Sequence, residues 1–165
     1  MGDADDAHDV PNVAPRLTSI YSLPVPSALY SRDILRLAAA ISHLGRLDRP
    51  QASAEKSSPV CGSRVAVDVA LDGQGRVAAL GQEVKACALG QASASLMAAH
   101  AVGRTGAEIE EARDALADYL ARRREGPGDW PGLEVFAEAR RVPARHASIL
   151  LAFDAAAEAA AKAAR

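Results

Sequence analysis

Residues 64–71 alternate between apolar and polar or small side chains, with one side formed by Val65, Val67, Val69 and Leu71. A period of two predicts a half-buried β-strand. The segment Asp72-Gly73-Gln74-Gly75 is typical of a hairpin turn, because glycine tolerates positive φ. Residues 76–84 are then expected to return as the antiparallel partner, so the pattern predicts a β-hairpin.

Helical periodicity occurs on both sides of this hairpin. Ser31 is a suitable N-cap for a helix whose apolar stripe consists of Ile34, Leu37, Ala38, Ile41 and Leu44, ending before Gly45. Residues 46–60 contain Pro50 and Pro59 and are expected to form a surface loop. Further helices are predicted after Cys87 as far as Gly103, over 105–124, over 132–141, and from the Val142-Pro143 break to the end of the chain.

This order predicts an α+β fold in which a small antiparallel sheet packs against several helices. The sheet is a hairpin that a third strand can join. With 165 residues and 49% hydrophobic composition, the chain suits one domain, predicted over 28–165, after a mobile N-terminal tail, 1–27.

Charge and cysteine content argue against a secreted disulfide scaffold and against general binding to nucleic acid or membranes. Residues 1–10 hold four aspartates and no basic residue, unlike a secretory signal, and no long apolar run follows them. A net charge of -2 gives no general attraction to nucleic acid or to an anionic membrane. Two cysteines are too few for a disulfide scaffold, so we expect a cytoplasmic protein with free thiols.

Cys61 and Cys87 are the candidate reactive residues. Cys61 follows the predicted loop, and Cys87 lies where the second strand gives way to a helix. A helix N-terminus stabilises a thiolate, which predicts a lowered thiol pKa for Cys87. Count and spacing alone also allow two buried, inert cysteines.

Three blocks together resemble the NifU/IscU/SufU family of iron–sulfur cluster assembly proteins. Residues 58–62, Ser-Pro-Val-Cys-Gly, are similar to the family's Pro-x-Cys-Gly-Asp segment. Residues 85–97, Lys-Ala-Cys-Ala-Leu-Gly-Gln-Ala-Ser-Ala-Ser-Leu-Met, resemble the Gly-Cys-x-Ile-Ser-x-Ala-Ser-Ala-Ser-Met-Met block of the SufU branch. Residues 142–148, Val-Pro-Ala-Arg-His-Ala-Ser, are similar to the Phe-Pro-Ala-Arg-x-x-Cys that opens the last helix. The long segment between the last two blocks resembles the SufU-type insertion, so the chain is placed nearest that branch.

The resemblance implies a non-enzymatic scaffold or a sulfur-acceptor accessory protein. Family members use three cysteines and one aspartate to bind zinc or a nascent iron–sulfur cluster, and they accept persulfide sulfur from a cysteine desulfurase. Cys61 and Cys87 match the first two cysteines and are the expected cluster or metal ligands, with Cys61 as the candidate persulfide acceptor. A cysteine desulfurase and other iron–sulfur assembly proteins are the implied partners, and a homodimer would bring four thiolates together.

Two family positions have changed. Ser63 stands at the aspartate position, and a gap-free match puts Ser148 at the third cysteine, whereas matching His146 to the histidine of the IscU branch puts Ala147 there. A serine hydroxyl is a poor ligand for zinc or iron, so a bound cluster or zinc is expected to be labile, or absent. His146 is a candidate replacement ligand, and Arg145 is expected to approach the same end. The alternative function is a metal-free adaptor that keeps the fold and the partner surface without chemistry.

Overall fold

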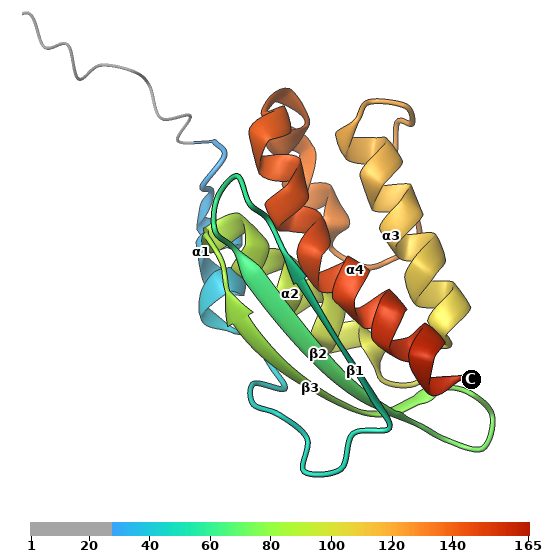
Figure 1. The fold of residues 1–165 in the computed structure, drawn as a ribbon. Helices are drawn as coiled ribbons and strands as arrows, with labels where there is room; N and C mark the ends of the chain where they lie inside the picture. The colour runs from blue at the N-terminus through green and yellow to red at the C-terminus, as the bar shows by residue number, and fades with distance from the viewer. Residues whose placement is uncertain (1–27) are drawn as a thin grey trace, which may run out of the picture.

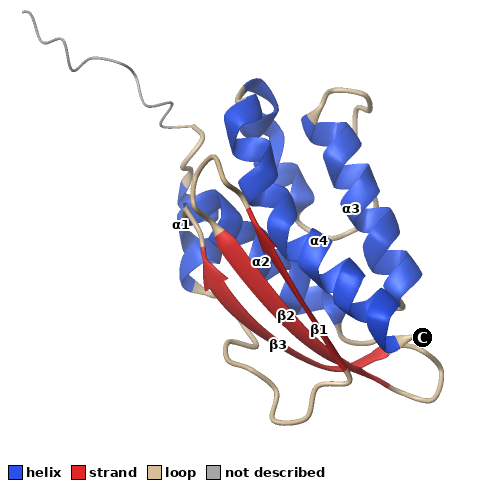
Figure 2. Ribbon diagram, in the orientation of Figure 1, coloured by secondary structure: helices blue, strands red, loops and turns tan. Residues whose placement is uncertain are grey.

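The structure, a computed structural model, describes residues 28–165; the predicted tail 1–27 lies outside the described residues. Three antiparallel strands form one sheet with helices packed against it (Figure 1, Figure 2), which confirms the predicted α+β class. The elements in chain order are α1 (Arg32–Ala39), β1 (Ala52–Ser57), β2 (Arg64–Leu71), β3 (Val77–Lys85), α2 (Ala88–Ala101), α3 (Gly106–Leu120), η1 (Leu133–Arg141), η2 (Pro143–Arg145) and α4 (His146–Ala163). None of the helices in the described part is long and apolar enough to cross a membrane.

The predicted hairpin is present as β2 and β3, and β1 adds the third strand on the free edge of β2. Residues 46–60 are therefore not a continuous loop, because Ala54 pairs with Val67 within the β1–β2 ladder. The segment Ala-Ser-Ala-Glu-Lys-Ser contains no β-branched or aromatic residue, so local propensity gave no strand signal. Pairing with the neighbouring strand decides its conformation.

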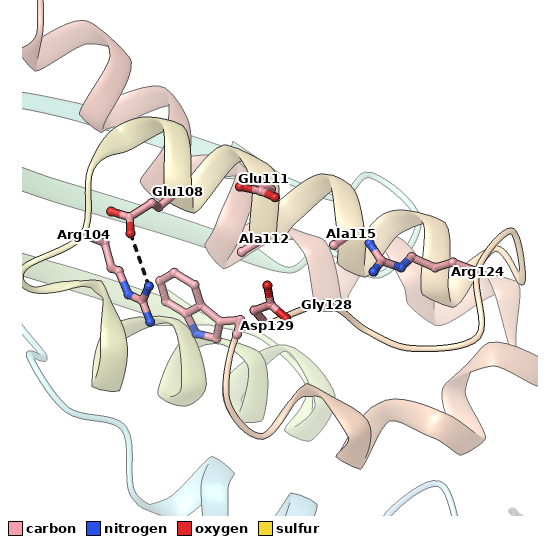
Figure 3. Close-up of a pocket in the computed structure, with 9 residues that line it drawn as sticks. Arg104, Glu108, Glu111, Ala112, Ala115, Arg124, Gly128 and Asp129 are labelled. Atoms are coloured by element: carbon pink, nitrogen blue, oxygen red, sulfur yellow. Dashed lines mark hydrogen bonds and ion pairs between the residues drawn. The ribbon is translucent and has the colours of Figure 1, made fainter.

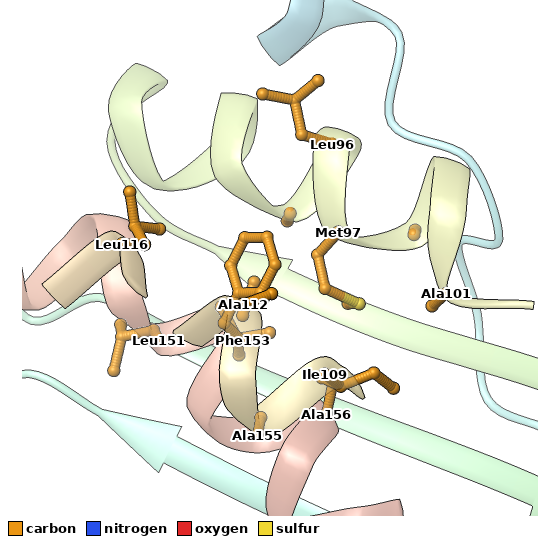
Figure 4. Packing of buried hydrophobic residues seen from close by; sticks show 14 of the residues in the cluster. Leu96, Met97, Ala101, Ile109, Ala112, Leu116, Leu151, Phe153, Ala155 and Ala156 are labelled. Carbon is orange, nitrogen blue, oxygen red and sulfur yellow. The ribbon is translucent and has the colours of Figure 1, made fainter. Parts of the chain in front are cut away.

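One face of the sheet is covered by helices. Val65, Val67 and Val69 point into this layer and are fully buried. Phe153 of α4 lies between Met97 of α2 and Leu116 of α3 (Figure 4), and all three are buried. Along α4 the buried positions are mostly alanines, whose small side chains let the helix lie close to β1 and β2. The position of the N-terminus of α4 is thereby fixed against the sheet.

Helix α1 is shorter than predicted, because it ends at Ala39 rather than near Leu44. Beyond it the chain pairs with the outer edge of β3: Gln82 donates its N–H to the His43 carbonyl at 2.9 Å, and Gly45 donates to the Gln82 carbonyl at 2.8 Å. The Gly45 N–H is thus bonded to β3 and is not available to bond within a longer α1.

The same segment covers the second face of the sheet, where the pattern predicted solvent. Asp68 on β2 is buried there and accepts hydrogen bonds from Arg46 at 2.6 and 2.7 Å, from the Leu47 N–H at 3.0 Å, and from the Ser53 hydroxyl. Burial acts to raise the pKa of Asp68, but the donors, with Arg46 foremost, outweigh it, so the pKa lies below its usual value.

We predict that Asp68→Asn lowers the free energy of unfolding at pH 7 by about 2 kcal/mol, because charge-assisted hydrogen bonds are lost from a buried site. The folded-state pKa is depressed, so this contribution is present above the unfolded pKa of about 3.9 and is lost as pH falls through the folded pKa. Denaturant unfolding of both proteins at several pH values measures the difference.

Glu83→Gln is the matched control, since the exposed Glu83 carboxylate lies 3.8 Å from the same guanidinium of Arg46. It should change the free energy of unfolding by less than about 1 kcal/mol. Equal effects of the two substitutions would show that Asp68 does not anchor the 43–47 segment.

Candidate functional site

The β2–β3 register brings the two cysteines to one end of the sheet. Arg64 pairs with Lys85 as the last pair of the ladder. Cys61 lies three residues before Arg64, and Cys87 lies two residues after Lys85, where it is the N-cap residue of α2. The junction position predicted for Cys87 is therefore confirmed.

Cys61 sits in a tight turn held by its own backbone. Ser58 donates its N–H to the Ser63 carbonyl at 2.8 Å, and Gly62 donates to the Ser58 carbonyl at 2.9 Å. Gly62 has a φ of 67°, a left-handed conformation that favours glycine. The turn leaves Cys61 half-buried and turns the hydroxyl-bearing residues Ser58 and Ser63 inward, where both are buried.

Four family positions meet in one hydrogen-bonded group. The Cys61 thiol donates to Ser63 Oγ at 3.0 Å, Ser63 Oγ lies 3.3 Å from Ser148 Oγ, and Ser148 Oγ lies 3.2 Å from Cys87 Sγ. Ser148 is buried in the first turn of α4. Of the two matches to the third cysteine, the gap-free one gives Ser148, which lies beside the thiols. The other gives Ala147, which is exposed.

The two thiols open onto the surface. An open hollow of about 330 Å³ is lined by Cys61, Gly62, Ser63, Lys85, Ala86, Cys87 and Gln91. Ser63 forms part of its wall and Ser148 lies beneath. A partner's reactive group can therefore reach the sulfur atoms without unfolding the domain.

Hydroxyl groups lower the pKa of the Cys61 thiol to about 7. The Ser58 hydroxyl contributes most, followed by the hydroxyl and backbone N–H of Ser63; burial opposes them, and Ser148 adds a smaller favourable contribution. Ser58 Oγ is buried and has no other hydrogen-bond partner within residues 28–165. It is therefore free to donate to a thiolate at Cys61.

Sequence reasoning looked for an activated thiol at Cys87, on helix N-terminus grounds, and missed the hydroxyls around Cys61. The signal was the concentration of serines, Ser57-Ser58 and Ser63, on either side of Cys61.

Gly90 is a second site residue that sequence reasoning missed. A Cβ atom at Gly90 would lie 2.7 Å from both the Ala86 side chain and Ser148 Oγ, closer than such atoms can approach. In the resembling SufU block the equivalents of Ala86 and Gly90 are glycine and serine. Because Gly90 has no side chain, Ser148 of α4 can lie directly against α2.

His146 does not join the thiol group. Its Nε2 lies 2.9 Å from the Ala139 carbonyl oxygen, and its ring lines a different hollow with Pro143 and Arg140. Two residues correspond to about 200° around an α-helix, so Ser148 and His146 face opposite sides of α4. Arg145 is half-buried in η2 and is also absent from the lining of the thiol hollow.

Within the described range no three His, Cys, Asp or Glu side chains form a group that could hold a metal ion. Two thiols and two neutral hydroxyls do not fit a tetrahedral zinc site or a four-thiolate cluster. The donor set of one chain therefore does not match the resident metal that the resemblance implied.

A separate cavity of about 210 Å³ lies between α3 and the segment before η1 (Figure 3). Arg104 donates to Glu108 at 3.3 Å and lies over the Trp130 ring at 5.5 Å. None of the predicted site residues lines this cavity. Arg104, just before α3, thereby contacts the segment that carries Trp130, and the cavity is separate from the thiol site.

Fold and thiol geometry together describe an assembly-scaffold domain, and comparisons with known proteins agree. The sequence profile of the family described as "NifU-like N terminal domain" matches residues 29–126, so the chain belongs to this family. No curated protein sequence is recognisably similar to the chain.

Solved structures extend the likeness to a larger share of the chain than the family profile matches. A "Nitrogen-fixing NifU-like protein (N-terminal)" from Brucella abortus is 38% identical with a TM-score of 0.78, covering 84% of this chain and 96% of that one. A "putative iron-sulfur cluster assembly scaffold protein for SUF system" from Fervidobacterium Islandicum AW-1 has a TM-score of 0.72 at 22% identity, covering 82% and 98%; at this identity the likeness concerns the fold. The predicted family, and with it the class of non-enzymatic assembly scaffold, is confirmed.

We predict that Ser58→Ala raises the pKa of Cys61, because the largest donor to its thiolate is lost. A thiol with a pKa of about 7 is about half ionised at pH 7, whereas an ordinary thiol is only a few per cent ionised, so the alkylation rate at pH 7 should fall at least about threefold. The rate–pH profile with iodoacetamide, measured on a Cys87→Ser background to isolate Cys61, gives the pKa directly.

Ser57→Ala is the control, since Ser57 is exposed next to Ser58. It should leave the profile unchanged. An unshifted profile in Ser58→Ala would mean that the Ser58 hydroxyl does not reach the sulfur.

Proposed function

We propose that this protein acts in iron–sulfur cluster assembly as a sulfur acceptor, with Cys61 receiving sulfur as a persulfide. The observation that carries the proposal is the hydrogen-bonded group of Cys61, Ser63, Cys87 and Ser148, whose two thiols line one open hollow. Both thiols of the family site are kept in place, while the two positions that would complete a metal site carry neutral hydroxyls. The arrangement suits sulfur chemistry better than permanent metal binding.

Transfer to Cys61 is a thiol exchange reaction. The Cys61 thiolate attacks the terminal sulfur of a persulfide on a cysteine desulfurase, a new S–S bond forms at Cys61, and the desulfurase cysteine leaves as a thiolate. Attack requires an exposed and ionised thiol. Cys61 lines the open hollow, and the hydroxyls of Ser58 and Ser63 hold its pKa at about 7.

The cluster is the cargo of such a protein, and one chain offers it two thiolates. We therefore propose that a nascent iron–sulfur cluster, or zinc, is held briefly, with the other ligands coming from a partner or from a second copy. The expected partners are a cysteine desulfurase and other iron–sulfur assembly proteins, in the cytoplasm.

Sulfur loading tests the acceptor role. We predict that a cysteine desulfurase with free cysteine adds the mass of one sulfur atom to the Cys87→Ser variant, in which no second thiol can attack the product, on the peptide that contains Cys61. Cys61→Ser should abolish the gain, because a serine hydroxyl cannot attack sulfur. Intact mass under non-reducing, anaerobic conditions, followed by peptide mapping, is the measurement.

The adaptor hypothesis gives the opposite result in the same experiment. An unmodified chain that nevertheless forms a stable complex with the desulfurase would support an adaptor without chemistry. The matched variant Ser57→Ala, outside the thiol group and made on the same Cys87→Ser background, must load like its parent for the loss in Cys61→Ser to be informative.

We predict that Ser63→Asp with Ser148→Cys increases zinc affinity at least about 100-fold, because it restores a carboxylate and a third thiolate to a backbone that already groups the four positions. Competition with a chromogenic chelator compares the two proteins. Ser57→Asp with Ala147→Cys places the same residue types at exposed neighbouring positions and should bind zinc little better than wild type. If the site variant is no tighter than this control, the four side chains do not point at a common centre.

A further inference from the structure

Two serine hydroxyls, those of Ser63 and Ser148, connect the two sulfur atoms through hydrogen-bond contacts. Cys87 Sγ contacts Ser148 Oγ at 3.2 Å, and Cys61 Sγ reaches the same hydroxyl pair through Ser63 at 3.0 Å. Both cysteines are free and half-buried, and both line the same hollow. In this chain, neither a carboxylate nor a third thiolate stands at the family positions that would tie the thiols to a metal.

We propose that Cys87 resolves a persulfide on Cys61, releasing hydrogen sulfide and leaving a Cys61–Cys87 disulfide. This step rests on the proposed function, in which Cys61 carries the sulfur. It gives Cys87 a role of its own, as the thiol that converts bound sulfur into sulfide.

The reaction balances without an external reductant. Cys87 sulfur attacks the inner sulfur of the Cys61 persulfide, the bond between inner and terminal sulfur breaks, and the terminal sulfur leaves as hydrosulfide. The two cysteine sulfurs are oxidised to the disulfide, and the terminal sulfur is reduced by the same two electrons. The Cys87 proton passes to Ser148 Oγ, the hydroxyl it contacts, and leaves through Ser63 to the hollow, where it completes hydrogen sulfide.

The end of the β2–β3 ladder brings the chain segments that carry the two cysteines side by side. If the β2–β3 ladder continued two positions beyond Arg64 and Lys85, Gly62 would face Cys87, and Cys61 is the next residue. Opposed residues in an antiparallel ladder have Cα atoms about 4.5–5.5 Å apart, and disulfides join Cα atoms about 4.4–6.8 Å apart. The ladder stops at Arg64, and the turn at Gly62 is where the chain can close the remaining distance.

The buried Ser58 hydroxyl supplies an independent observation that points to this sulfur. It is 3% exposed and unpartnered within the described residues, and it belongs to the turn that carries Cys61. A persulfide on Cys61 gives that hydroxyl an acceptor, which orients the inner sulfur while the terminal sulfur projects into the hollow.

The test uses inorganic polysulfide to load the protein, so that it does not depend on a desulfurase. After excess reagent is removed anaerobically, wild type should release about one sulfide per Cys61 persulfide formed and should end as the Cys61–Cys87 disulfide, seen as a loss of two hydrogens by non-reducing intact mass. Cys87→Ser should retain its persulfide and release sulfide only when an external dithiol is added. Cys61→Ser, loaded in the same way, reports sulfur attached directly to Cys87.

Several results would overturn the proposal. They are a wild-type persulfide that persists beside a free Cys87 thiol, a migration of the sulfur to Cys87 in place of its release, and a failure of polysulfide to modify Cys61. Thermal unfolding of Cys87→Ser near that of wild type shows that the fold is intact. If the polysulfide reaction proceeds but a desulfurase does not load Cys61, the proposed function fails while the resolving role of Cys87 stands.

Discussion

The antiparallel register of β2 and β3 is the constraint on which the thiol site depends. It ends with Arg64 opposite Lys85, and so it fixes the turn that carries Cys61 against the start of α2, where Cys87 lies. Helix α4 packs along β1 and β2 through alanine side chains and brings Ser148 to the same point from a distant part of the sequence. Three separate elements therefore meet at the two thiols, which is the geometry that a shared two-thiol site needs.

Serine at positions 63 and 148 changes the chemistry at this hollow, while both side chains remain packed in the domain. Ser63 and Ser148 are buried, and each satisfies the other by hydrogen bonding. A carboxylate and a thiolate in their place would add two negative charges, which a cation would have to balance. With hydroxyls the site is neutral until Cys61 ionises, and the same hydroxyls then stabilise the anion. The domain can keep its fold and thiols without a permanently bound metal.

Much of this arrangement was predictable from the sequence, and what was missed has physical causes. Strict alternation of valines predicted β2, and the resemblance of the blocks around Cys61, Cys87 and Ser148 to the family implied their grouping. β1 was assigned to a loop because Ala, Ser, Glu and Lys carry no strand preference, so only pairing with β2 reveals it. The burial of Asp68 was not predicted, because alternation cannot show that the 43–47 segment returns across the second face of the sheet.

The orientation of single side chains was the least predictable feature. His146 is two residues from Ser148, yet its ring turns to the Ala139 carbonyl, because the two positions lie on opposite sides of α4. The burial of Ser58 was equally unpredictable, because the sequence does not show whether a serine lies at the surface or is buried in a turn beside a thiol.

The Ser58 hydroxyl bears on the sulfur chemistry proposed for Cys61. A buried hydroxyl without a partner costs about 1–3 kcal/mol, and alanine at this position would avoid the cost. When Cys61 becomes an anion, the same hydroxyl gains a charged acceptor, and a hydrogen bond to a charged group contributes about 1.5–3 kcal/mol. The penalty in the resting state is thus offset when negative charge forms on Cys61 sulfur. Such a residue stabilises the reactive state at the expense of the resting one, which is the behaviour expected of a group that serves chemistry at Cys61.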